Sequence, residues 1–152
     1  MSEYRIEKVR LHVALAVVGG GALEGDIFLQ PSALYRMGPQ DPAELFNEAE
    51  SFIPFDMGAK GMILLAKDQV MRVQFTGASA DTDIDGVEGV PVEISLTDGS
   101  RVEGDMHFDP RIDGPRLLDF LNRHHERFLT LTCAPGVCLV NWRQIAQVRQ
   151  RT

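Results

Sequence analysis

Residues 92–108 have the sequence VEISLTDGSRVEGDMHF. Apolar side chains alternate with polar ones in the first five residues and return after the turn, which is the two-residue period of a half-buried β-strand. The intervening TDGS segment contains Gly99, which can adopt the positive φ that a tight hairpin turn needs. The stretch therefore predicts an antiparallel hairpin with strands at 92–96 and 101–108.

A related pattern occurs earlier in the chain. Residues 23–28, LEGDIF, match residues 102–107, VEGDMH. Four further matches follow in the same order: a proline, the segments LFN and FLN, the segments FIPF and FLTL, and the segments MILLAKDQV and VCLVNWRQI. Five ordered matches indicate an internal duplication. We therefore expect two copies of one small β-rich unit, at 1–75 and 90–152, joined by the acidic linker 76–89.

Each unit is expected to contain five short strands and one short helix after the second strand. In the first unit, Asp41 is a good N-cap and Pro42 suits the first helical position. In the second unit, Gly114-Pro115 precedes the helical pattern. Five short strands bury little core as an open sheet, so we expect a mainly β fold in which each unit curls into a small barrel.

The pattern VxIxLxDGxxVxGxM of residues 92–106 resembles the first motif of the Sm-like (LSm) family, and residues 139–148 are similar in spacing to the closing strands of the bacterial Sm-like RNA chaperone. The resemblance implies two tandem Sm-like barrels. It also implies assembly into rings through edge strands and, as in many members, RNA binding. The Arg-Gly signature of the archaeal and eukaryotic members is absent from both units.

Composition and charge narrow the function classes. Hydrophobic residues make up 44% and charged residues 24%, as in a globular protein, and the net charge of −7 disfavours RNA as a partner. No apolar run approaches the roughly 20 residues of a membrane helix. The charged start of the chain lacks the apolar core of a signal peptide. We therefore expect a cytoplasmic protein without membrane contact.

The chemically versatile residues form no recognisable catalytic or metal motif. Cys133 and Cys138 do not combine with His124-His125 in the spacing of a zinc site, and we expect two reduced, buried thiols. The carboxylates of the two Glu-Gly-Asp segments share one strand face, and their glycines fit a strand bend or close packing. No nucleophile elbow or phosphate loop is present. We expect no enzymatic activity, metal or cofactor.

The predicted contact residues are Trp142, Arg143, Lys67 and Arg111. Trp and Arg are enriched at binding hot spots and also stack on nucleotide bases. Packing of Trp142 against the second helix, a subunit or partner interface, and nucleotide stacking are the interpretations that stay open.

The sequence favours a non-enzymatic binding or assembly module built from two Sm-like barrels. The expected partner is the chain itself, as a dimer or trimer, and another protein is a further partner class. The unpaired outer edges are expected near 62–67 and 145–148. An RNA-binding Sm-like protein is the alternative, and a small-molecule or metal-binding domain is a more distant one.

Overall fold

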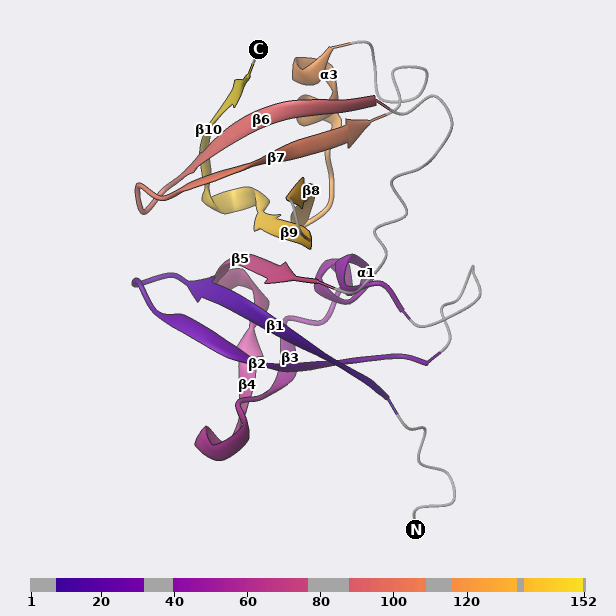
Figure 1. The fold of residues 1–152 in the computed structure, drawn as a ribbon, viewed down its shortest axis with the longest axis vertical. Helices are drawn as coiled ribbons and strands as arrows, with labels where there is room; N and C mark the ends of the chain where they lie inside the picture. Colours follow the sequence, from indigo (N-terminus) through magenta and orange to yellow (C-terminus); the bar gives the residue numbers. More distant parts are fainter. Residues whose placement is uncertain (1–7, 32–39, 77–87, 109–115, 134–135, 152) are drawn as a thin grey trace.

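The structure, a computed structural model, describes residues 8–31, 40–76, 88–108, 116–133 and 136–151. In these residues the fold is mainly β, as expected, with ten antiparallel strands in one open sheet. Figure 1 shows the two halves of the chain above one another, with β5 and β9 between them. Most of the linker 76–89, the Gly114-Pro115 pair and Arg111 lie outside the described residues.

In its described residues, the first half has five strands, one α-helix and two 3₁₀ turns. Their order is β1 (Val9–Val17), β2 (Ala22–Leu29), α1 (Pro42–Asn47), β3 (Phe52–Asp56), η2 (Gly58–Lys60), β4 (Met62–Ala66), η3 (Lys67–Gln69) and β5 (Val70–Phe75). The described elements of the second half follow the same order, and residues 134–135, which connect its third and fourth strands, lie outside the described residues. Its elements are β6 (Glu88–Leu96), β7 (Arg101–Phe108), α3 (Leu117–Arg123), β8 (Phe128–Cys133), β9 (Gly136–Asn141), η4 (Trp142–Gln144) and β10 (Ile145–Gln150).

Local sequence explains the hairpins and the first helix. Gly99 has φ +87° in the β6–β7 turn, and the Asp98 side chain accepts a hydrogen bond from Ser100 N at 2.9 Å. Asp41 caps α1 by accepting from Ala43 N at 3.0 Å, with Pro42 at the first helical position. These contacts confirm the predicted hairpin and helix start.

Strand register is the same in the two halves. The pair Val13–Gly25 of β1 and β2 corresponds to Val92–Gly104 of β6 and β7, 79 residues later. The pairings of β3 with β4 and of β8 with β9 also correspond, as do those of β1 with β5 and of β6 with β10. Even the irregularity in the last strand recurs, because the pairing skips Met71 in β5 and Ala146 in β10. Equivalent positions can therefore be assigned from backbone geometry: they differ by 76 residues in the third strand and by 75 in the fourth and fifth.

The halves join through one strand pairing. The order across the sheet is β10-β6-β7-β8-β9-β5-β1-β2-β3-β4, so β5 of the first half pairs with β9 of the second. We call this pairing, with the side chains that flank it, the inner seam. The sheet ends at β4 and β10, which are the segments predicted to be outer edges.

The inner seam lies between two apolar cores, each of which includes side chains from the other half. The core of the first half includes Phe128, Val137 and Leu139 of the second half, and the core of the second half includes Met71 of the first. The ring of Phe128 meets the ring of Phe46 of α1 edge to face, with centroids 5.3 Å apart. The two halves therefore complete each other's interior.

Candidate functional site

The outer edge of the sheet at β4 carries an exposed apolar face. Phe52 of β3 is 60% exposed, and Met62 and Leu64 of β4 are 56% and 73% exposed. Large apolar side chains that gather in one exposed patch mark interaction sites more often than scattered ones do. We call these three residues the β4 face.

The opposite end of the sheet carries a groove between α3 and β10. Its volume is about 350 Å³, and its lining combines apolar and amide side chains: Leu118, Leu121, Asn122, Trp142, Ile145, Ala146, Gln147 and Val148. Leu118 is 56% exposed at its rim. We call this the α3–β10 groove.

A more polar pocket of about 570 Å³ lies beside the inner seam and contains Trp142 and Arg143, two of the predicted contact residues. The Trp142 ring lies 4.7 Å from the ring of His124, and Arg143 is exposed. His124 in turn meets Phe120 edge to face at 5.9 Å. Trp142 is thus half-buried against the residue that follows α3, and it lines both this pocket and the α3–β10 groove.

The electrostatics of this pocket are mixed. Burial lowers the pKa of His124, which the nearby Glu126 charge partly offsets, and its Nε2 is buried without a hydrogen-bond partner. Arg127 Nε lies 3.3 Å from Asp68 Oδ1, a salt bridge that crosses between the halves. The pocket therefore presents an aromatic wall next to paired charges of both signs.

The other predicted contact residues are placed differently. Lys67 is fully buried, and its Nζ donates to the carbonyl oxygen of Glu48 at 3.2 Å. Burial, together with the positive charge of Arg127, lowers the pKa of Lys67. Its ammonium group holds the backbone before β3 and does not reach the surface, and Arg111 lies outside the described residues.

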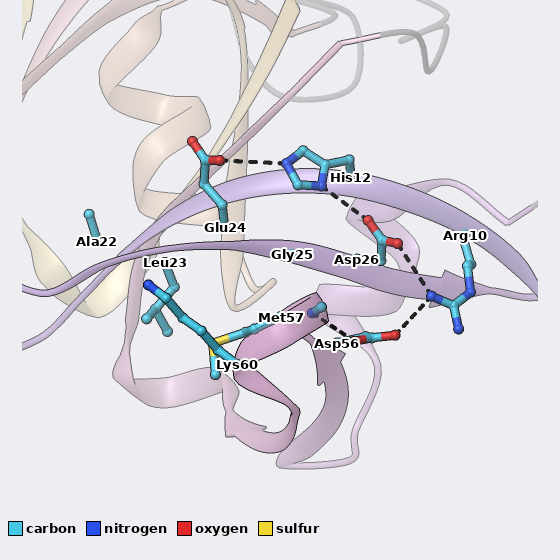
Figure 2. A pocket seen from close by; sticks show the side chains of 11 residues that line it. Arg10, His12, Ala22, Leu23, Glu24, Gly25, Asp26, Asp56, Met57 and Lys60 are labelled. Atoms are coloured by element: carbon cyan, nitrogen blue, oxygen red, sulfur yellow. Dashed lines mark hydrogen bonds and ion pairs between the residues drawn. The ribbon is translucent and has the colours of Figure 1, made fainter.

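A third hollow, of about 640 Å³, is lined by charged residues of β1, β2 and β3. Figure 2 shows a chain of ion pairs along it, from Glu24 through His12, Asp26 and Arg10 to Asp56. Arg10 Nη1 donates to Asp56 at 2.9 Å. The Gly58 amide and Arg10 together lower the pKa of Asp56, and Asp56 raises that of Arg10.

Arg10 and His12 lie close to the carboxylates of this hollow. A general acid at neutral pH needs a raised carboxyl pKa, which burial or a like charge provides. The pKa of Asp56 is shifted in the opposite direction, and Glu24 and Asp26 both lie near His12. The pKa shift of Asp56 therefore does not suit the role of a general acid.

The glycines of the two Glu-Gly-Asp segments, Gly25 and Gly104, have a packing role. A Cβ on Gly25 would lie 2.4 Å from the Asp56 carbonyl oxygen, and one on Gly104 would lie 2.8 Å from both Thr132 O and Cys133 Sγ. The neighbouring strand thus passes too close for a side chain. Close packing was one of the two explanations expected for these glycines, and the distances favour it.

Both cysteines are free thiols, Cys138 buried and Cys133 half-buried. Their mutual hydrogen bond lowers the pKa of Cys133 and raises that of Cys138, which burial raises further. Within the part of the chain that the structure describes, no group of three His, Cys, Asp or Glu side chains is arranged to hold a metal ion.

The β4 face and the charged hollow were not expected from the sequence. In the β1–β2 hairpin of the structure, His12 lies opposite Asp26 and Arg10 opposite Phe28, so charged residues that alternate along both strands are the signal for the hollow. Arg10 stacks over the Phe28 ring, 4.9 Å from its centroid. For the β4 face, the signal was the apolar character of Met62 and Leu64 on the same side of a strand expected at an edge.

No family model, curated protein or solved structure matches this chain. In the described residues, none of the helices has the length and apolar character to cross a membrane.

Proposed function

We propose that this chain is a non-enzymatic assembly module built from two Sm-like small barrels that arose by internal duplication. The equal element order and register of the halves support the duplication. The inner seam supports the Sm-like relation, because it joins the fifth strand of one half to the fourth of the other. This arrangement resembles the pairing of edge strands between neighbouring units in Sm-like rings.

The observation that carries the proposal is the pair of sheet ends, β4 and β10, whose outer edges meet no further strand among the described residues. β4 and β10 are a fourth and a fifth strand, the two kinds of strand that pair at the inner seam. An unpaired edge exposes a row of N–H and C=O groups that can pair with another chain. One chain therefore carries both halves of a second seam at opposite ends.

Such a contact is head-to-tail, because β4 of one chain would meet β10 of the next. Head-to-tail contacts close into rings when the rotation permits and otherwise continue as filaments. A ring of a few tandem chains leaves no free edge, which makes a small closed homo-oligomer the expected product, most simply a dimer or trimer.

Native mass and ultraviolet absorbance of protein purified at low salt test this function. We expect a discrete homo-oligomer with the absorbance ratio of pure protein. A monomer near 16.9 kDa at micromolar concentration would contradict the proposal.

RNA binding is the second candidate, favoured by the aromatic wall of Trp142 and His124 beside Arg143 and Arg127. Aromatic side chains and arginine are typical of single-strand binding sites. Trp142 is the sole tryptophan of the chain, so its fluorescence reports directly on this pocket. Quenching by a short oligonucleotide that disappears in Arg143→Ala would favour RNA binding, and unchanged fluorescence would count against it.

A further inference from the structure

The inner seam shows how a fourth strand docks in this fold. Phe128, Val137 and Leu139 are at most 5% exposed, and they are the residues of the second half that enter the first half's core. The pairing that brings them there includes Val73 with Leu139 and Phe75 with Val137.

The β4 face occupies the equivalent positions. Counting by the matched strand register, Phe52 corresponds to Phe128, while Met62 and Leu64 of β4 correspond to Val137 and Leu139 of β9. The three residues that are buried at the inner seam thus have three apolar equivalents that are more than half exposed.

The residues of the first half that pack against these docked side chains also have equivalents in the second half. In the first half, Phe46, Val70 and Val73 are fully buried beneath the docked residues. Their counterparts in the second half are Leu121, Ile145 and Val148. These counterparts remain partly exposed, and they line the α3–β10 groove.

We propose that the β4 face of one copy docks into the α3–β10 groove of a second copy, with β4 and β10 pairing so that Leu64 lies opposite Val148. This inference rests on the proposed assembly function and specifies its contact. Transferring the inner register also places Leu65 opposite Gln147 and Met62 opposite Gln150, from the pairs Val140–Arg72 and Val137–Phe75. Burying three large apolar side chains supplies the driving force for association.

The outer seam is the weaker of the two, because it lacks most of the polar contacts of the inner one. At the inner seam, the Asn141 side-chain amide donates to the carbonyl oxygens of Val70 and Asp68 at 2.9 and 3.3 Å, and Arg127 pairs with Asp68. The equivalents of Asn141 and Arg127 are Ala66 and Ser51, which cannot make these contacts.

For one polar contact of the inner seam, the equivalent residue is present at the outer edge of the sheet. Asn47 Oδ1 accepts from Phe128 N at 2.7 Å, and its amide donates to Glu126 at 2.6 Å. The counterpart of Asn47 is Asn122, which lines the open groove and is exposed. In the proposed seam, Asn122 of the second copy accepts from Phe52 N of the first copy. An outer seam with this contact and the apolar triad opens on dilution, while the inner seam stays closed.

Cross-linking between two single-cysteine proteins tests the register. In a background with Cys133→Ser and Cys138→Ala, one chain carries Leu64→Cys and the other Val148→Cys. Directly opposed strand residues lie within the Cα separation that a disulfide spans. We expect mild oxidation of the mixture to yield a cross-linked dimer, and the register control Leu64→Cys with Gln147→Cys, one residue away and on the other strand face, to yield much less. Equal yields, or no cross-link, would overturn the register.

A charge in the β4 face tests the same contact without oxidation. Leu64→Asp should weaken self-association by about tenfold or more, as expected for a residue buried at the centre of an interface. The matched control is Val18→Asp, an exposed apolar residue at the β1–β2 turn, which should leave association unchanged. Circular dichroism of each variant verifies that the fold is kept.

The outcomes separate this contact from the function itself. An oligomer that survives Leu64→Asp and gives no 64–148 cross-link would contradict the docking contact and leave assembly standing. A wild-type chain that stays monomeric would contradict both. Loss of association in Val18→Asp as well would also count against the contact, because the effect would not be specific to the β4 face.

Discussion

Strands β9 and β4 hold equivalent places in the two halves but have opposite surroundings. Every residue of β9 from Val137 to Asn141 is buried, whereas β4 buries Leu65 and leaves Met62 and Leu64 in solvent. The strands share register and apolar character, so the difference comes from the neighbour: β9 lies against β5, and β4 is at the end of the sheet. Exposure on β4 is therefore better explained by a missing partner than by a different local fold.

The polar residues add a second difference. The inner seam combines apolar burial with Asn141, Asn47 and Arg127, while the outer edges keep the apolar part and one asparagine. Buried polar groups with all their hydrogen bonds specify one arrangement, and an apolar contact alone is easier to reverse. A permanent seam within the chain and an exchangeable seam between chains are the expected result.

The largest effect expected from this comparison is on stability at the inner seam. Phe128→Ala should lower the free energy of unfolding by about 3–5 kcal/mol, because it empties a packed site against Phe46. The equivalent Phe52→Ala should cost less than about 1 kcal/mol in dilute solution, where Phe52 is exposed. Denaturant unfolding of both variants provides the comparison, and similar losses would show that the seams do not differ.

The next largest effect on stability is expected from substitutions of the closely packed glycines Gly25 and Gly104. Gly25→Ala should destabilise by about 1–3 kcal/mol, since the new Cβ would meet a backbone oxygen at 2.4 Å. Gly104→Ala should cost less than Gly25→Ala, because its nearest atoms lie at 2.8 Å and one is the Cys133 side chain. Thermal melts rank the pair, and an unchanged melting midpoint in Gly25→Ala would remove the packing role assigned to this glycine.

The amide at the inner seam should have a smaller effect. Asn141→Ala leaves the carbonyl oxygen of Val70 without this donor and should cost about 1–2 kcal/mol. The reverse change, Ala66→Asn, places an amide at the equivalent outer position and should tighten self-association. Unfolding curves and sedimentation of the two variants test these effects, and an unaltered association in Ala66→Asn would break the equivalence at this position.

The smallest effect concerns the pH dependence of stability at the polar pocket beside the inner seam. Burial lowers the pKa of His124, so the folded chain takes up this proton less readily than the unfolded chain. The stability that depends on neutral His124 is complete above about pH 6.5, the unfolded value, and is lost as pH falls below it. The variant His124→Phe should flatten this part of the stability profile, and an identical profile would show that another group titrates there.

Local elements were predictable from the sequence, and their environment was less so. The turn at Gly99 and the cap at Asp41 follow from residue types, and the edge positions of β4 and β10 follow from the Sm-like resemblance together with the repeat. The sharing of core residues between the halves could not be predicted in this way. The alternation of apolar residues along a strand indicates which face is buried, but it does not indicate which half of the chain covers that face. Phe128 and Leu139 therefore have the pattern of core residues of their own unit.

Lys67 illustrates a second limit. A lysine in a turn between two strands is normally solvated, and Lys67 was one of the predicted contact residues. Its burial depends on the backbone of Glu48, which the fold brings beneath it. A contact of this kind between distant segments leaves no local pattern. The contact between the rings of Trp142 and His124 is likewise one between segments that no local pattern links.

Hydrogen exchange over a concentration series tests the central claim most directly. Mass spectrometry of peptides covering β4, β10, β5 and β9 compares the outer edges with the inner seam in one sample. We predict that β5 and β9 are protected at every concentration, while protection of β4 and β10 rises together as the protein is concentrated. Exchange in β4 and β10 that is fast and independent of concentration would contradict the account.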